Sequence, residues 1–285
     1  MVKIVFMGAV SFLLLNSCSK KSDDVIAKVE TNQTCIPEAK LLAKGIVGGK
    51  RVNPTDKDST AVAMVLSIGE EEFGTCTASL ISPKVLLTAA HCIKASVDKT
   101  LVIFHTAISC ESGFDSTKNS KRVSKITIHK DYIPTIPSTE TTIGKEGTDD
   151  IALIILTEPA PENYAIYKIA DPLEVKDSRI YFYGYGVTGS NDGGSGILRK
   201  TSFSNDLFYV EKENNKIRLK QNSGTGICFG DSGGPGLVNI NGEAQILGVN
   251  SFVQGPDDDS CNGTATLALA EAYKGWIKSS LKANE

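Results

Sequence analysis

Short apolar runs rich in β-branched residues recur along the chain, and Gly, Pro, Asn and Asp separate them. Runs of this length bounded by turn residues are typical of β-strands. Many such strands indicate an all-β barrel or sandwich. The one helix of any length that the pattern predicts covers residues 271–281. Strands are predicted at 61–68, 85–88, 101–105, 123–128, 151–156, 180–183 and 246–252.

The first residues carry the pattern of an export signal. Lys3 precedes an apolar run over 4–15, which is shorter than the ~20 residues that span a bilayer as a helix. A positive start, a short apolar run and a small residue before a cleavage site predict a secretory signal over 1–18. Its end resembles a bacterial lipobox, in which Cys18 becomes the lipid-bearing N-terminus. The alternative is a plain signal peptide removed together with Cys18. We expect an exported protein, either lipid-anchored in a bacterial envelope or secreted or periplasmic.

Two polar segments lie outside the expected core. Residues 19–45 have mixed charge, contain Cys35 and are interpreted as a linker or propeptide. Residues 135–147 are polar, rich in Thr and Gly, and predicted to form a surface insertion. The folded domain is therefore expected to cover 46–285.

Composition and charge limit the classes of function that the protein can have. Apolar residues make up 41% and charged residues 22%, enough apolar content to fold. The net charge of −3 disfavours a nucleic-acid partner, because phosphate binding normally needs a basic surface. Seven cysteines in an exported chain indicate disulfide bonds.

Two suggestive strings do not predict a cofactor or a metal. Residues 184–189 spell G-x-G-x-x-G, but 190–196 consist of Ser, Asn, Asp and Gly and cannot begin the helix that a dinucleotide site needs. Three adjacent carboxylates at 257–259 lack the ligand spacing of a calcium loop and are interpreted as a solvated turn. We expect no cofactor and no metal.

Three segments carry residues suited to nucleophilic catalysis. Ser232 stands in the string Gly-Asp-Ser-Gly-Gly-Pro over 230–235, where glycines permit a tight turn. A serine hydroxyl needs a base to take its proton. His91 follows an apolar strand and two alanines, a setting that would hold an imidazole rigidly, whereas His105 and His129 are interpreted as structural or exposed. Asp150 precedes an apolar strand, where a carboxylate can orient a histidine.

Together the three segments resemble the chymotrypsin-like (trypsin-like) serine proteases, which carry His, Asp and Ser in this chain order. Further matches run from Ile-Val-Gly-Gly at 46–49 to Trp-Ile at 276–277. The resemblance implies two six-stranded antiparallel β-barrels, at about 46–160 and 161–265, with the active site between them. Protein or peptide substrates are implied as partners.

The resemblance also assigns roles. His91 would be the general base and then acid, and Asp150, preferred to Asp149, would orient it. Ser232 would be the nucleophile, with Ser251 beside Asp150. The backbone N–H groups of Gly230 and Ser232 would form the oxyanion hole.

Activation by cleavage is a further implication of the resemblance. Asp231 would be buried and would pair with the new α-amino group of Ile46. The family is usually cut directly after Lys or Arg, but here Gly45 separates Lys44 from Ile46. An activating protease is therefore expected, acting either after Gly45 or after Lys44 with later trimming.

The resemblance pairs Cys76 with Cys92 and Cys228 with Cys261. Cys35 and Cys110 remain if Cys18 is lipidated or removed, and we expect them to form a third bridge.

A small, uncharged primary specificity pocket is expected, as in an elastase. Gly226 would form its base, where a trypsin carries Asp, and Val253 and Ala265 would form its walls. Thr264 is the alternative to Ala265 as a wall residue. Cleavage after Ala, Val or similar residues is therefore expected. A non-catalytic binding module with the same fold is the rival function, because fold does not guarantee activity.

Overall fold

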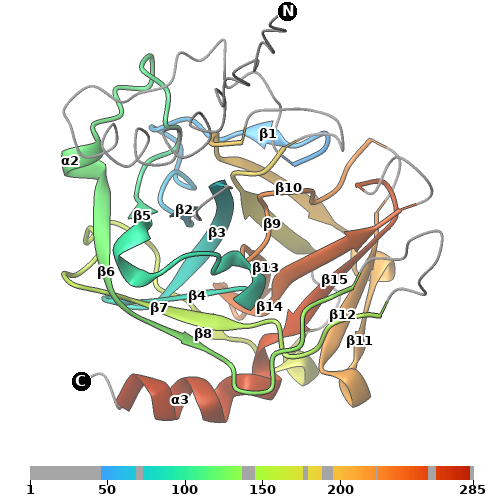
Figure 1. The fold of residues 1–285 in the computed structure, drawn as a ribbon. Coiled ribbons are helices and arrows are strands. Elements are labelled where there is room, and N and C mark those ends of the chain that lie inside the picture. Colours follow the sequence, from blue (N-terminus) through green and yellow to red (C-terminus); the bar gives the residue numbers. More distant parts are fainter. Residues whose placement is uncertain are drawn as a thin grey trace, which may run out of the picture.

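The computed structural model describes residues 46–68, 73–136, 145–175, 179–187, 195–221, 224–255 and 261–282. Two β structures pack against each other, and a helix near the C-terminus lies below them in Figure 1. One is a closed six-stranded barrel and the other is a nine-stranded sheet. The all-β class predicted from the pattern is confirmed. The predicted signal peptide and propeptide, residues 1–45 with Cys18 and Cys35, lie outside the described residues. The carboxylates at 257–259 also lie outside them.

The barrel is antiparallel and joins its strands in the order β2-β3-β4-β7-β6-β5. Strands β4 and β7 are buried along their whole length, which explains their unbroken apolar runs. Strand β3 was missed because Gly, Thr and Ser interrupt its apolar residues. The bounds are β2 (Ala63–Ile68), β3 (Phe73–Ser82), β4 (Val85–Thr88), β5 (Thr100–Ile103), β6 (Ser120–Ile128) and β7 (Ala152–Leu156).

The second sheet runs β1-β10-β9-β13-β14-β15-β12-β11, and β8 pairs with β14 in parallel. Strand β1 pairs with β10, so the segment after Ile46 joins this sheet and not the barrel expected for 46–160. The bounds are β1 (Lys50–Arg51), β8 (Lys168–Ile169), β9 (Ile180–Gly184), β10 (Arg199–Phe203), β11 (Phe208–Glu211), β12 (Lys216–Lys220), β13 (Pro235–Ile240), β14 (Glu243–Gln254) and β15 (Thr264–Leu269).

The helices are short. The α-helices are α2 (Ser116–Asn119) and α3 (Lys274–Lys282); the 3₁₀ turns are η2 (Ala90–Cys92), η3 (Val97–Lys99), η4 (Pro172–Glu174), η5 (Asn205–Leu207), η6 (Lys212–Asn214) and η7 (Ala270–Tyr273). Helix α3 buries Ile277, and η7 buries Tyr273, in the apolar cluster that fills the barrel. Among the described helices, none is long and apolar enough to cross a membrane.

Candidate active site

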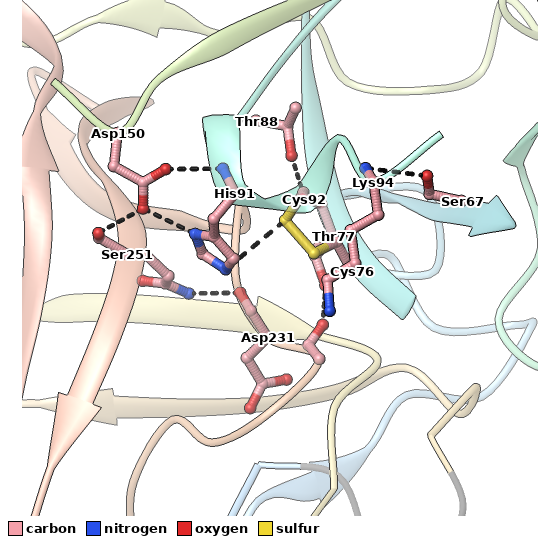
Figure 2. The surroundings of a disulfide bond; sticks show 12 residues. Ser67, Cys76, Thr77, Thr88, His91, Cys92, Lys94, Asp150, Asp231 and Ser251 are labelled. Carbon is pink, nitrogen blue, oxygen red and sulfur yellow. Dashed lines mark hydrogen bonds and ion pairs between the residues drawn. A yellow bond between two sulfur atoms is a disulfide. The ribbon is translucent and has the colours of Figure 1, made fainter. Parts of the chain in front are cut away.

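A histidine and an aspartate are brought together by the pairing of β4 with β7. Thr88 at the end of β4 lies opposite Ala152 at the start of β7. His91 lies in the 3₁₀ turn η2 just after β4, and Asp150 lies just before β7. The His91 Nδ1–Asp150 Oδ2 distance is 2.7 Å, and the His91 backbone N–H donates to Asp150 Oδ1 at 2.9 Å (Figure 2). Because the carboxylate accepts from Nδ1, the other ring nitrogen is left as an acceptor.

Ser251, on strand β14 of the second sheet, completes the surroundings of Asp150. Its Oγ donates to Asp150 Oδ2 at 2.5 Å, across the boundary between the two β structures. Burial raises the pKa of Asp150, but the hydrogen bond and charge of His91 and the Ser251 hydroxyl outweigh it and hold the pKa below its usual value. The carboxylate therefore stays ionised beside the imidazole. Asp149 takes a left-handed φ of 52° and its side chain is hydrogen-bonded to Tyr273 instead.

Ser232 lies on the loop between β12 and β13 and shares one cleft of about 760 Å³ with His91, Asp150 and Ser251. The loop is docked onto strand β3, because Thr77 N–H donates to the Ser232 carbonyl at 2.8 Å and Thr77 Oγ1 donates to the Gly230 carbonyl at 3.1 Å. The cleft is lined by His91, Tyr132, Pro134, Thr135, Ile136, Lys145, Glu146, Asp150, Ile227, Cys228, Phe229, Ser232, Asn250, Ser251, Phe252, Val253, Gln254 and Gly255.

The turn around Ser232 needs glycine. Gly230 and Gly233 have φ of 91° and 78°, in the left-handed region. A Cβ on Gly233 would lie 2.1 Å from Thr88 Oγ1. Although the carbonyls of Gly230 and Ser232 are hydrogen-bonded to Thr77, their N–H groups meet no acceptor within the described part of the chain. Two such unpaired donors beside a serine can bind an oxyanion.

Asp231 is fully buried on the inner side of the same loop. Its carboxylate accepts from the backbone N–H of Cys228 and of Gly186, each at 2.9 Å, and the Ile46 N–H is a further donor. Burial raises the pKa of Asp231 to about 7, against these hydrogen bonds and the charge of Arg199. A Cβ on Gly184 would lie 2.1 Å from Asp231 Oδ1, so the glycines of the G-x-G string make room for this carboxylate.

Two disulfides frame the cleft. Cys76–Cys92 ties β3 to the turn that carries His91, and Cys228–Cys261 ties the Ser232 loop to the start of β15. Cys110 is also disulfide-bonded, while its expected partner Cys35 lies outside the described residues. Ligand atoms of Cys76, His91 and Cys92 lie within 4.8 Å of one another, but both sulfurs are used in the disulfide and offer no thiolate to a metal.

Two of the residues expected in the specificity pocket, Ser251 and Val253, line the cleft, as does Ile227 next to Gly226. Ala265 lies directly opposite Val253 in the sheet and is buried in the core, and Thr264 is exposed. Gly226 as the base of the pocket and Ala265 as a wall residue stay predictions.

Gln221 packs beside Gly226, and the sequence did not identify it. A Cβ on Gly226 would lie 2.7 Å from the Gln221 side-chain amide, which thus occupies the space that a side chain at 226 would need. The amide donates to the carbonyls of Ile227 and Cys261 and accepts from the Ile227 N–H. No local motif marks this glutamine, because its role depends on these tertiary contacts.

Ser232, His91 and Asp150 thus line one cleft, and comparison with known proteins gives the chain a family. The sequence matches the trypsin family over residues 46–277. It is 27% identical over 252 residues to chymotrypsin-like elastase family member 1 of the dog, covering 84% of this chain and 93% of the relative. The human protein of the same name is 25% identical over the same length, with the same coverage. An ovochymase of Halocynthia roretzi is 28% identical over 217 residues, 71% of this chain and 13% of the relative. The chain belongs to the trypsin family of serine proteases.

Proposed function

We propose that the protein is a serine endopeptidase that hydrolyses peptide bonds with Ser232, His91 and Asp150. The observation that carries the proposal is the placement of these three side chains on one cleft, with His91 Nδ1 2.7 Å from Asp150. A paired imidazole presents its other nitrogen as a base, which a serine nucleophile requires.

The chemistry proceeds in two displacements. Ser232 Oγ attacks the scissile carbonyl carbon while His91 Nε2 takes the hydroxyl proton, and Asp150 stabilises the imidazolium. The oxyanion lies against the N–H groups of Gly230 and Ser232, each such donor typically contributing ~3 kcal/mol. His91 gives the proton to the leaving amine, which leaves an acyl group on Ser232. Water then attacks the acyl carbonyl carbon while His91 takes its proton. His91 returns the proton to Ser232 Oγ, which releases the acid and restores the serine.

The protein is made as a zymogen in this proposal. Asp231 is buried with neutral N–H donors, and a buried carboxylate is best stabilised by a cation. Ile46 is fully buried and its N–H already points at Asp231, so a cut before Ile46 would convert that donor into an ammonium group. Because Gly45 precedes Ile46, the activating protease either cuts after Gly45 or cuts after Lys44 with later trimming of Gly45.

The primary pocket is shallow and uncharged in this proposal, which favours small aliphatic residues before the scissile bond. Val253 lines the cleft, and the Gln221 amide fills the space below Gly226 where a carboxylate would bind Lys or Arg. The names of the elastase relatives agree with this choice. Pocket size discriminates by ~1–3 kcal/mol per methylene, so a preference is expected and not an absolute choice.

Disulfides within the domain fit an exported protein. The lipobox-like string ending at Cys18 supports a lipid anchor, and a Cys35–Cys110 bridge would keep a cleaved propeptide attached to the protease. The relatives named above are animal proteins, so the bacterial setting depends on this string alone.

A serine-directed organophosphonate probe tests the proposal. Protein processed to begin at Ile46 should be labelled and should cleave peptides, and the full-length protein should react far more slowly. The matched control is the processed Ser232→Ala variant, which should do neither. Equal peptide cleavage by that variant would refute the mechanism. A peptide library then tests the pocket, and dominant cleavage after Lys or Arg would refute the predicted preference.

A further inference from the structure

One wall of the cleft is built by a segment of the barrel that precedes Asp150. Its two arms are joined by isolated bridges, Ile133 with Thr148 and Ile136 with Lys145. Side chains of both arms line the cleft opposite the end of strand β14. We call residues 133–136 and 145–148 the cleft wall. The polar segment predicted as a surface insertion therefore begins and ends at the site, while 137–144 lie outside the described residues.

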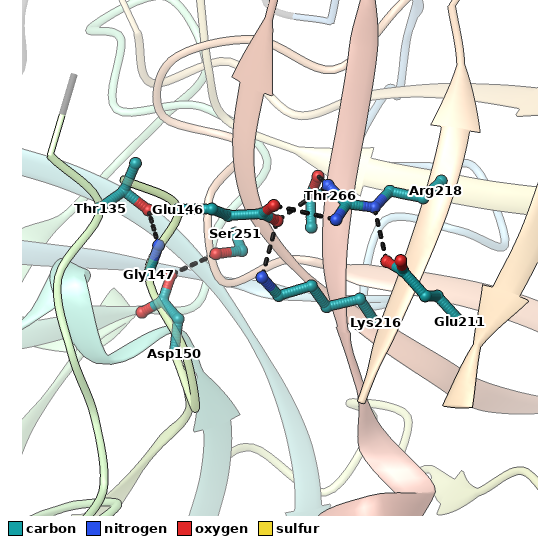
Figure 3. A network of polar contacts seen from close by, with 9 residues as sticks. All are labelled: Thr135, Glu146, Gly147, Asp150, Glu211, Lys216, Arg218, Ser251 and Thr266. Atoms are coloured by element: carbon teal, nitrogen blue, oxygen red, sulfur yellow. Dashed lines mark hydrogen bonds and ion pairs between the residues drawn. The ribbon is translucent and has the colours of Figure 1, made fainter. Parts of the chain in front are cut away.

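The cleft wall is attached to the second sheet by ion pairs of Glu146. Arg218 of β12 holds both of its carboxylate oxygens, with Nη1–Oε1 at 2.8 Å and Nη2–Oε2 at 2.9 Å. Lys216 Nζ lies 2.8 Å from Oε1 (Figure 3). We call Glu146, Lys216 and Arg218 the latch.

The latch has the features that distinguish an effective ion pair from a loose surface contact. The side-chain exposures are 31%, 12% and 19% for Glu146, Lys216 and Arg218. Arg218 is oriented further by Glu211, 2.9 Å from Nε, and by Thr266 Oγ1, 2.9 Å from Nη1. Burial raises the pKa of Glu146, but the hydrogen bonds and charges of Arg218 and Lys216 lower it below its usual value. Two-point contacts within a network contribute more than isolated exposed pairs.

Contacts next to the latch join the two arms of the cleft wall to each other. Gly147 N–H donates to Thr135 Oγ1 at 3.0 Å, and a Cβ on Gly147 would lie 2.4 Å from the Ile133 carbonyl. The two arms are therefore held against each other by this hydrogen bond and by close packing. Asp150, in contrast, has its own hydrogen bonds to His91 and Ser251, which do not involve the latch.

We propose that the latch holds the cleft wall at a fixed distance from strand β14, and that Glu146 and Arg218 thereby position an extended peptide in the cleft. They are positioning residues and take no part in the chemistry. The inference rests on the proposed peptidase function, and it adds that binding of residues beyond the scissile bond depends on an ion-pair network between the two β structures.

The test compares four variants of the protein processed to begin at Ile46: Glu146→Gln, Arg218→Met, the double variant and the control Glu158→Gln. Met keeps the length of the arginine stem, and Glu158 forms an ion pair with Lys121 that involves neither the latch nor the residues lining the cleft. Rates are measured on peptide amides with one and with four residues before the scissile bond. For the longer substrate, KM should rise roughly three- to tenfold in each single variant, with kcat within twofold.

Three further results separate positioning from general destabilisation. The one-residue substrate should keep its kcat/KM within twofold, because Asp150 is held independently of the latch. The double variant should match Glu146→Gln, because Glu146 is the member that both ion pairs of the latch share. The control Glu158→Gln should bind and cleave both substrates as the parent does.

Binding without chemistry distinguishes the failure of this inference from the failure of the peptidase proposal. In the Ser232→Ala background, calorimetry with an uncleaved four-residue peptide should show a three- to tenfold weaker affinity after Glu146→Gln. Absence of labelling of the parent by the serine probe would overturn the peptidase function but leave this measurement meaningful. Equal affinity and equal KM in latch variants and control would overturn the latch.

Discussion

Asp150 lines the cleft and Asp231 is buried within the Ser232 loop, and their surroundings differ in the kind of donor. Asp150 faces the His91 imidazole and a hydroxyl, and its pKa is held below the usual value. Asp231 is buried among backbone N–H groups, and burial raises its pKa to about 7. A buried carboxylate whose direct hydrogen-bond donors are backbone N–H groups is stabilised further in its ionised form when a cation contacts it. Under the proposed activation, the intact chain completes the Asp150 half of the site by itself, and the Asp231 half depends on a new N-terminus.

The largest expected effect on activity comes from removing the carboxylate of Asp150. Asp150→Asn should lower kcat of the processed protein by ~10⁴-fold, because an amide does not stabilise the imidazolium and favours the wrong tautomer. Peptide hydrolysis by active-site-titrated protein measures it. A loss of less than tenfold in a folded variant would show that Asp150 does not act through His91.

The second prediction concerns Asp231→Asn. This substitution should lower the activity of the processed protein but raise the stability of the full-length protein. In the processed protein, the Ile46 ammonium loses its counter-charge, and activity should fall by ~100-fold or more. In the full-length protein at pH 7, the same change removes a buried titrating carboxyl and should raise the free energy of unfolding. Peptide hydrolysis and denaturant unfolding check the two outcomes, and unchanged activity after processing would contradict the proposed activation.

The pH dependence of stability sharpens the comparison. Asp231 has an ordinary pKa of 3.8 and a folded pKa of about 7 in the intact chain. Between these values the folded state holds a proton that the unfolded state has released, so the stability contributed by Asp231 is lost as pH rises from about 4 to about 7. The slope is at most ~1.4 kcal/mol per pH unit.

The processed protein should lack this slope, because the Ile46 ammonium stabilises the ionised carboxylate. Asp150 contributes with the opposite sign, since its folded pKa is lowered: its stabilisation is lost as pH falls below the ordinary value. Denaturant unfolding from pH 4 to 8 measures both forms, with full-length Asp231→Asn as the control. An identical slope in that variant would assign the effect to other groups.

The smallest effect concerns the space around Asp231. Gly184→Ala would place a Cβ 2.1 Å from Asp231 Oδ1 and should destabilise the fold by ~1–3 kcal/mol. Gly275→Ala is the matched control, because no atom lies within 4 Å of that Cβ in helix α3, and helix propensity should stabilise it by up to ~1 kcal/mol. Thermal unfolding compares them. Equal melting temperatures would mean that the sheet yields at Gly184.

Local patterns predicted the parts of this protein that depend on neighbours in sequence. Unbroken apolar runs identified β4 and β7, because both strands are buried on both faces. The strings around His91, Asp150 and Ser232 identified the cleft residues. Strands such as β12, with alternating Lys, Arg and apolar residues, were missed because short amphipathic strands resemble surface loops until a neighbour pairs with them.

The sequence by itself determined the all-β class, the family and the residues that meet in the cleft, because each of these depends on short strings of residue types. Only the tertiary structure decided how those residues are supported. Gln221 fills the space below Gly226 through a contact with Cys261 40 residues away, and Glu146 meets Arg218 across 72 residues. The opposite pKa shifts of Asp150 and Asp231 likewise arise from burial and from donors that distant strands supply. Such contacts depend on how the two β structures pack, and no local pattern records that packing.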